Sequence, residues 1–338
     1  MAQSEFLKAF QGKNTKVPVW FMRQAGRSLP QYQALREHYS LAEMFSNADL
    51  VAKVTCLPVE VLEVDAAILF ADILTLPKHM GFEINFDKNH GPVILNQIKH
   101  VNDVKTIRDF EGVEYLGKAI RAINEQLPGS VPLIGFAGAP FTVLTYLLEG
   151  GSSATFAKTL NFLYTQTQTY AKLMEKLTKN TISYLNYQKR AGIKVFQLFD
   201  TWAGQLSADV YGQYVLPYVQ KIFKAVDLPS IYYVKNCSHV LALMDKTDAD
   251  FLSVCHTVNL SENGVLAKTK KGVQGNLFTG LLYSDAKTLK QETNALLKSA
   301  KKYKRYIFNL SHGVNPDVQV EKLRTVVEAV HAFTWPAA

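Results

Sequence analysis

A few side chains in this sequence have types and neighbours that could do chemistry. They are Arg23 and Arg27 in MRQAGR, Asp72 in FADIL, Tyr146 in TYLLEG and His312 in NLSHG. Arginine presents a planar fork of donors that matches a carboxylate or a phosphate. A phenol or an imidazole adds further hydrogen bonds. Together these residue types predict a site for an acidic organic substrate.

Each candidate also has a purely structural interpretation. Arg23 and Arg27 could form salt bridges with Glu37 or Asp72, and Asp72 could instead cap a turn. Tyr146 could belong to the core, and His312 could be a loop residue. Other chemistries lack their motifs, because the chain has no Walker loop and no nucleophile elbow.

Eight short apolar runs, rich in β-branched and aromatic residues, predict strands. Most are continuous rather than alternating, which is typical of parallel strands covered on both faces. They span residues 17–22, 66–70, 131–137, 193–199, 230–235, 250–255, 272–277 and 306–311. Nearly every gap between them holds an amphipathic helical pattern. The clearest predicted helices are 153–191 before Gly192, 207–227 capped by Ser207, 284–303 from Ser284 and Asp285, and 317–333 from Asp317.

Strands that alternate with helices eight times predict an α/β protein, a (β/α)8 TIM barrel forming one domain over residues 1–338. A doubly wound open sheet is the alternative, but eight strands are many for it and no GxGxxG follows the first strand. Residues 78–100 predict a β-hairpin inserted after the second strand.

The barrel prediction gives the candidate residues a common location, since barrel active sites lie at the C-terminal ends of the strands. Arg23 and Arg27 follow the first predicted strand, and Asp72 follows the second. Tyr146 lies in the helix after the third strand, and His312 ends the eighth. Further strand-end residues are Asp200, Thr201 and Trp202, then Lys235, Asn236 and His239, then His256 and Ser311.

The composition excludes several other classes of protein. Apolar residues make up 48% of the 338 residues, which is ordinary for a globular chain. Three scattered cysteines and no secretory signal predict a cytoplasmic location. The uncharged run 126–148 contains prolines and glycines that favour a buried strand and a turn over a membrane span. The net charge is +8, and residues 268–305 alone carry that surplus, so we expect a solvated basic face away from the site.

Six segments resemble the uroporphyrinogen decarboxylase family, in family order and across almost the whole chain. They are PVWFMRQAGRSLPQY (18–32), FADIL (70–74), GFAGAPFTVLTYLLEG (135–150), QLFDTWAG (197–204), QGN (274–276) and FNLSHGVNPD (308–317). The resemblance implies a (β/α)8 homodimer that needs no cofactor or metal. It implies removal of CO₂ from the four acetate side chains of uroporphyrinogen III, giving coproporphyrinogen III, without a nucleic-acid or membrane partner.

The resemblance also implies roles for the matched positions. Asp72, Arg23 and Tyr146 match catalytic residues, with Asp72 accepting hydrogen bonds from the pyrrole N–H groups. The substrate-binding positions matched are Arg23, Arg27, Asp72, Tyr146, Thr201, His312 and Tyr32. The absence of a cofactor is consistent with the chemistry of this reaction, because a protonated pyrrole can itself accept the electron pair that decarboxylation leaves behind.

Three places depart from the family pattern and leave one rival function. The departing residues are Asn236 with Cys237, Cys255 with His256, and Phe278 with Thr279. Related barrels are zinc-dependent corrinoid methyltransferases, and Cys237, His239, Cys255 and His256 could supply zinc ligands. Their order is reversed, however, and the eighth strand ends in a histidine rather than a cysteine. A nucleic-acid binder, suggested only by the charge, lacks any known binding motif.

Overall fold

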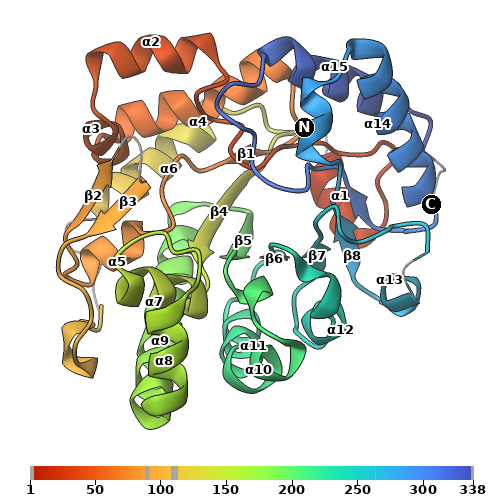
Figure 1. The fold of residues 1–338 in the computed structure, drawn as a ribbon. Coiled ribbons are helices and arrows are strands. Elements are labelled where there is room, and N and C mark those ends of the chain that lie inside the picture. Colours follow the sequence, from red (N-terminus) through yellow and green to blue (C-terminus); the bar gives the residue numbers. More distant parts are fainter. Residues whose placement is uncertain (1–3, 88–90, 108–112, 263, 336–338) are drawn as a thin grey trace.

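The computed structural model describes residues 4–87, 91–107, 113–262 and 264–335. Seven parallel strands form one curled sheet in the order β1-β4-β5-β6-β7-β8-β9, with helices around the outside (Figure 1). The strands are β1 (Ala67–Ile68), β4 (Leu133–Gly138), β5 (Val195–Asp200), β6 (Ser230–Val234), β7 (Phe251–Ser253), β8 (Gly272–Gln274) and β9 (Tyr306–Ile307). Each strand pairs with the next along the sheet, so the α/β class predicted from the sequence is confirmed.

The first predicted strand, residues 17–22, is not a strand element but a single parallel bridge from Val19 to Phe308. The N–H of Phe308 donates to the carbonyl of Pro18 at 2.9 Å, and the N–H of Asp65 donates to the carbonyl of Val19 at 2.8 Å. Phe308 directly follows β9, and Asp65 lies just before β1. These bonds therefore attach the segment to the chain beside both outer strands of the sheet.

The helices follow the predicted pattern, with different ends. They are α1 (Glu5–Gln11), α2 (Pro30–His38), α3 (Leu41–Ser46), α4 (Ala48–Leu62), α5 (Thr75–His79), α6 (Glu114–Gln126), α7 (Pro140–Glu149), α8 (Ala157–Thr165), α9 (Thr167–Ala191), α10 (Ala208–Tyr214), α11 (Leu216–Ala225), α12 (Leu241–Met244), α13 (Gly264–Lys268), α14 (Ala286–Ala300) and α15 (Val320–His331). Short 3₁₀ helices are η1 (Val101–Asp103), η2 (Ala203–Gln205), η3 (Cys237–His239) and η4 (Thr279–Tyr283). Within the described ranges, no helix combines the length and the apolar character needed to span a bilayer.

Two helix predictions need correction. The helix expected over 153–191 divides into α8 and α9 at Gln166. The helix expected over 207–227 divides into α10 and α11, because Pro217 lacks an N–H and its ring clashes with the preceding turn. Ser207 does cap α10, since its side chain accepts from the N–H of Val210. The uncharged run 126–148 contains β4, as expected. The turn expected after this strand is short, because helix α7 begins at Pro140 and carries Tyr146, which the sequence places in a helix.

A small antiparallel sheet lies between β1 and β4 in the chain, at the edge of the molecule (Figure 1). Its strands are β2 (Ile84–Asp87) and β3 (Gly91–Ile94), with Ile84 paired to Ile94. These two strands fall within the range where the sequence predicts an inserted hairpin. The connecting residues 88–90 lie outside the described residues.

A chain of polar side chains crosses the interior of the main sheet. The indole Nε1 of Trp20 donates to Oε1 of Gln274 at 2.9 Å. The amide Nε2 of Gln274 donates to Gln197 Oε1 at 3.0 Å and to Ser253 Oγ at 2.9 Å. All four side chains are fully buried. Because buried polar groups are costly when unpaired, this network fixes the relative positions of β5, β7, β8 and the 17–22 segment.

Replacing Gln274 tests the importance of this network for stability. Gln274→Leu keeps the side-chain volume but leaves Trp20 and Gln197 without their buried partner. We expect the free energy of unfolding to fall by roughly 3 kcal/mol, measured by urea denaturation. Gln126→Leu, at an exposed position at the end of α6, is the matched control and should change little. Equal losses in the two variants would contradict the role of the network.

Candidate active site

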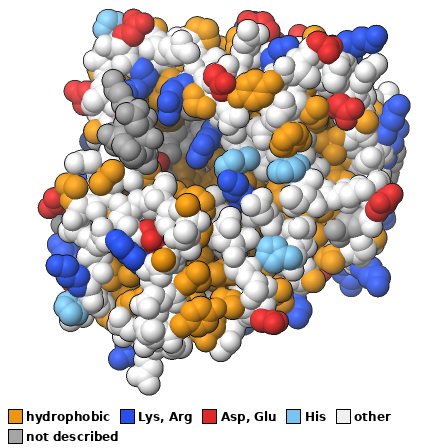
Figure 2. Space-filling view, in the orientation of Figure 1, with side chains coloured by type: hydrophobic (Ala, Val, Ile, Leu, Met, Phe, Trp, Pro, Cys, Tyr) orange, Lys and Arg blue, Asp and Glu red, His pale blue; other side chains and the backbone are white. Residues whose placement is uncertain are grey.

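A cavity of about 460 Å³ lies at the C-terminal ends of the strands. All seven residues that the sequence singled out as site residues line it: Arg23, Arg27, Tyr32, Asp72, Tyr146, Thr201 and His312. They come from five places in the chain, namely residues 23–32, 72, 146, 201 and 312, and only the fold brings these together. The face drawn in Figure 2 is hollowed near its middle, where Lys, Arg and His side chains gather.

The turn that carries Arg23 is held from both sides. The N–H of Val314 donates to the carbonyl of Met22 at 2.9 Å. The buried Gln24 accepts from the N–H of Phe21 and donates to the carbonyl of Ala66, at 3.0 Å each. Arg23 adopts the left-handed backbone conformation, with φ of 61°, which few non-glycine residues adopt without such support.

The side chain of Arg23 packs across Gly313. A Cβ atom at Gly313 would lie 2.4 Å from Cδ of Arg23, so only glycine leaves room for this path. Among the described residues, no carboxylate lies within ion-pair distance of Arg23 or Arg27. The structural salt bridges to Glu37 or Asp72 are therefore not formed, and both guanidinium groups remain available to an anionic ligand.

Asp72 combines a structural bond with a place on the cavity wall. Its Oδ1 accepts from the N–H of Leu74 at 2.8 Å, so the turn-capping interpretation is also correct. Burial raises the pKa of the carboxyl group, while the Leu74 N–H and the charge of Arg23 lower it. A carboxylate that is partly shielded from water attracts a cation or an N–H donor more strongly than one in bulk solvent.

His312 lines the cavity as a neutral ring. Its Nδ1 lies 3.0 Å from the hydroxyl of Tyr233, and the two rings are nearly parallel with centroids 6.1 Å apart. Burial, together with the charges of Arg23 and Lys235, lowers the pKa of His312 to about 4. The Tyr233 hydroxyl also lies 3.4 Å from the carbonyl of Ser311. Where its proton goes to Nδ1, the ring proton of His312 lies on Nε2 and can be donated to a ligand; where its proton goes to Ser311, Nδ1 carries the ring proton and Nε2 can accept.

Aromatic rings form much of the remaining wall. Tyr146 packs against Trp202 with centroids 5.7 Å apart, and Tyr32 meets Phe70 edge-on at 5.9 Å. Burial and the charge of Asp72 raise the pKa of Tyr146, so its phenol stays protonated at neutral pH. The small antiparallel sheet contributes two more wall residues, Phe86 and Pro92.

Sequence reasoning missed some of these wall residues. Phe86 and Pro92 belong to the inserted segment, and no motif in the sequence of that segment indicates that it packs against the cavity. Tyr233 lies within a predicted strand, and the alternation of side chains along β6 could have identified it as inward-facing. Lys235 and Trp202 were recognised as strand-end residues, and both line the cavity.

Asp200 does not line the cavity, but it holds in place the turn that carries two of the lining residues. It is fully buried at the end of β5, and accepts from Thr142 Oγ1 at 2.7 Å and from the hydroxyl of Tyr232 at 3.0 Å. Thr142 Oγ1 in turn accepts from the N–H of Trp202 at 3.1 Å. These bonds fix the turn that presents Thr201 and Trp202. Burial raises the pKa of Asp200 to about 6, against the lowering effect of both donors.

Other strand-end residues lie away from the cavity. His239 Nε2 contacts the carbonyl of Leu206 at 2.7 Å, and the ring of His256 packs on Phe278 with centroids 4.7 Å apart. None of the departing residues, Asn236, Cys237, Cys255, His256, Phe278 and Thr279, lines the cavity. Nor do three or more His, Cys, Asp or Glu side chains gather with metal-binding geometry anywhere in the described ranges. The ligand set of the rival methyltransferase is therefore not assembled.

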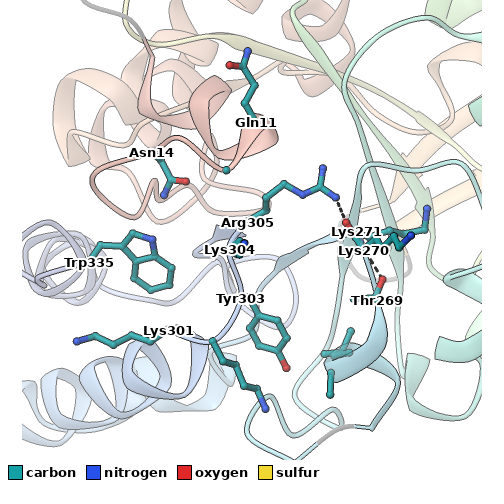
Figure 3. A pocket seen from close by; sticks show the side chains of 14 residues that line it. Gln11, Asn14, Thr269, Lys270, Lys271, Lys301, Tyr303, Lys304, Arg305 and Trp335 are labelled. Atoms are coloured by element: carbon teal, nitrogen blue, oxygen red, sulfur yellow. Dashed lines mark hydrogen bonds between the residues drawn. The ribbon is translucent and has the colours of Figure 1, made fainter. Parts of the chain in front are cut away.

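Six of the ten basic residues in 268–305 line a second cavity, of about 820 Å³, drawn in Figure 3. It lies before β8 and β9, at the N-terminal ends of the strands, and shares no lining residue with the first. Several of its cations already bond to backbone carbonyls: Lys271 to Ala249 at 2.8 Å, Lys302 to Ser261 at 2.6 Å and Arg305 to Phe10 at 3.3 Å. The basic face is thus separate from the candidate site, as the sequence predicts.

The fold and the cation-lined cavity define an α/β enzyme with a site for an acidic organic molecule. The chain belongs to the uroporphyrinogen decarboxylase family, whose model matches residues 1–333. It is 41% identical over 334 residues to the uroporphyrinogen decarboxylase of Thermodesulfovibrio yellowstonii, covering 98% of both chains. It is 39% identical over 346 residues to that of Roseiflexus sp., covering 99% of both.

A solved structure, a methyltransferase from Methanosarcina mazei, shares the fold with a TM-score of 0.82. The two chains are 21% identical, and the match covers 97% of this chain and 98% of the other. At this identity the likeness concerns the fold alone. Together with the curled parallel sheet, it places the chain among TIM-barrel-like proteins.

The raised pKa of Asp200 predicts a specific pH dependence of stability. The folded state binds a proton on Asp200 more tightly than the unfolded state, whose carboxyl titrates near 3.8. The stability that Asp200 contributes is therefore greatest below pH 3.8 and is lost as the pH rises towards 6. Asp200→Asn cannot titrate. The free energy of unfolding of the wild type, minus that of the variant, should fall by roughly 2 kcal/mol between pH 4 and pH 7. A difference that stays constant over this range, measured by urea denaturation, would contradict the assignment.

Proposed function

We propose that the chain removes CO₂ from the four acetate side chains of uroporphyrinogen III and releases coproporphyrinogen III. The observation that carries this proposal is the single cavity in which every matched family position is found. The family membership supplies the reaction, and the cavity supplies cations for the carboxylates with one carboxylate for the pyrrole nitrogens. The alternative, a zinc-dependent methyl transfer, receives no support from the arrangement of Cys and His side chains.

The two arginines bind and orient the substrate carboxylates. Arg23 and Arg27 have no carboxylate partner in the described chain, so a polycarboxylate would complete their ion pairs. A bidentate guanidinium fixes the orientation of a carboxylate as well as its position. A guanidinium has a pKa above about 12 and is a poor general acid. We therefore assign Arg23 a positioning function: it orients a substrate carboxylate, and it is not assigned as the donor of the proton that replaces CO₂.

Asp72 acts on the ring that loses CO₂. When that pyrrole is protonated, the ring carries a positive charge and can accept the electron pair of the breaking C–C bond. A carboxylate held beside the ring, and partly shielded from water, stabilises this charge more than the neutral substrate. Asp72 can accept N–H donors on Oδ2 while Oδ1 keeps its bond to Leu74.

The uncharged hydrogen-bonding groups complete the binding. His312 and Tyr146 offer a neutral N–H and a phenol O–H on the cavity wall, and Thr201 offers a hydroxyl. Tyr32 contributes its ring against one side of the cavity. Because these groups are neutral at pH 7, they orient carboxylates without holding them as tightly as the arginines do.

We also propose the finer features that the family resemblance implies. The chain forms one domain, and residues 17–22 supply the first strand, which closes the seven-stranded sheet into a (β/α)8 barrel, with a hairpin inserted within 78–100. The support is the pair of backbone contacts at Phe308 and Asp65. The protein works as a homodimer in the cytoplasm. Sedimentation equilibrium should give twice the mass of one chain, and a single-chain mass at micromolar concentration would contradict the dimer.

The central test is turnover of the porphyrinogen itself. Purified protein is incubated anaerobically with enzymatically generated uroporphyrinogen III under reducing conditions, with no added cofactor. Products with seven to four carboxylates should accumulate in sequence, measured by chromatography after oxidation to porphyrins. Absence of all these products at every enzyme concentration would overturn the proposed function.

Asp72→Asn tests the electrostatic part of the mechanism. The amide is the same size as the carboxyl group but cannot neutralise a pyrrolic cation. We expect kcat to fall by at least about 100-fold, a loss of roughly 3 kcal/mol of transition-state stabilisation. Asp209→Asn, an exposed position on α10, is the control and should retain full activity. Near-normal turnover of the folded Asp72→Asn variant would remove Asp72 from the mechanism.

A further inference from the structure

Two of the three cysteines lie side by side at the ends of neighbouring strands. Cys237 begins η3 after β6, and Cys255 follows β7 by two residues. Their sulfur atoms are 3.7 Å apart, and both are free thiols. The N–H of Cys237 also donates to Sγ of Cys255 at 3.4 Å. The two sulfurs are therefore already oriented towards each other.

The surroundings of the pair favour one thiolate and one thiol. Sγ of Cys255 has two further neighbours, the Cys237 thiol at 3.7 Å and Thr257 Oγ1 at 3.0 Å. These hydrogen bonds lower the pKa of Cys255, whereas the partner sulfur and burial raise the pKa of Cys237. A thiolate is the nucleophilic form of cysteine, so the two members of the pair differ in reactivity.

The third cysteine provides an internal comparison. Cys56 is buried in helix α4, and burial together with the charge of Glu60 raises its pKa to about 11. It lacks the adjacent sulfur and the donors that surround Cys255. We therefore expect Cys56 to remain unreactive under conditions that modify the pair.

We propose that Cys237 and Cys255 form a redox-sensitive pair, which a small peroxide oxidises to an intramolecular disulfide. The Cys255 thiolate attacks one oxygen of hydrogen peroxide, the O–O bond breaks, and the departing hydroxide takes up a proton to become water. The Cys237 thiol then loses its proton and attacks the resulting sulfenic acid, so that the S–S bond forms and a second water leaves. Two thiols lose two electrons and two protons, and the peroxide is reduced to two waters.

Burial determines which oxidants can react. Cys237 is 0% exposed and Cys255 is 1% exposed, but the next two residues, His256 and Thr257, are exposed. A peroxide is close to water in size and needs only a small local opening at this edge. A bulky aromatic disulfide reagent would need the loop to unfold, so it should modify the folded protein far more slowly.

The crosslink would also reach the candidate site. Forming an S–S bond of about 2.05 Å must draw the two sulfurs together. Lys235, which lines the cavity, lies two residues before Cys237. Its carbonyl packs directly against Gly204 in η2, so closely that an added Cβ there would lie only 1.8 Å from it. The carbonyl of Cys255 is held by Asn276 Nδ2 at 2.8 Å. We expect closure of the S–S bond to shift the loop that carries Lys235.

Mass spectrometry tests the chemistry without reference to activity. The full-length protein is treated with hydrogen peroxide, denatured, alkylated and digested with trypsin, which cuts after Lys246 and separates the two cysteines. We expect a linked pair of peptides, 236–246 and 247–268, with a loss of two hydrogen atoms and no alkylation of either cysteine. Cys56→Ser should give the same linked pair, and Cys237→Ser should not. A Cys255 that goes only to sulfinic acid, a link through Cys56, or no reaction would each overturn the proposal.

An activity measurement tests the consequence, which rests on the proposed function. In Cys56→Ser, decarboxylation should fall in proportion to the crosslinked fraction and return after dithiothreitol. Cys237→Ser should keep its own untreated rate under the same peroxide dose. Formation of the disulfide without loss of activity would overturn the link to the site but not the crosslink. Protein with no decarboxylase activity before treatment would overturn the proposed function alone.

Discussion

The hydrogen bonds that attach residues 18–20 to the chain beside β9 and β1 are the constraint on which the site depends. Phe308 and Asp65 anchor this short segment, and Trp20 extends the anchoring inward through Gln274. The chain leaves the segment directly into the turn that carries Arg23 and Arg27. A shift of one residue in this pairing would move both cations and would also break the contact between Arg23 and Gly313. The motif at residues 18–32 therefore encodes a backbone attachment as well as a set of ligand-binding side chains.

The sequence was informative wherever a residue's position along the chain determined its position in space. Continuous apolar runs predict parallel strands, and a parallel sheet collects the C-terminal ends of its strands on one edge. That rule alone predicts that Arg23, Asp72 and His312 approach one another, although long stretches of sequence separate them. The resemblance added Tyr32, and it distinguished Thr201 from the other strand-end residues.

The remaining features depend on tertiary contacts that leave little local trace. Gln197 and Gln274 read as ordinary strand residues, and only the fold makes them partners in the interior. No proline or glycine near Gln166 indicates in the sequence that the long helix divides there. Phe86 and Pro92 become wall residues because an inserted segment folds back over the cavity. Asp200 illustrates the same limit, since its neighbours Thr142 and Tyr232 are far away in the sequence.

The unpaired cations on the cavity wall have a consequence for the direction of catalysis. In the proposed reaction the positive charge of Arg23, Arg27 and Lys235 stays constant, while each loss of CO₂ removes one negative charge from the ligand. The attraction between protein and ligand therefore weakens stepwise as the reaction advances. Early intermediates are retained for further rounds, and the final product is the most weakly held of the series. A fixed set of charges can in this way retain the early intermediates and release the final product without a conformational change.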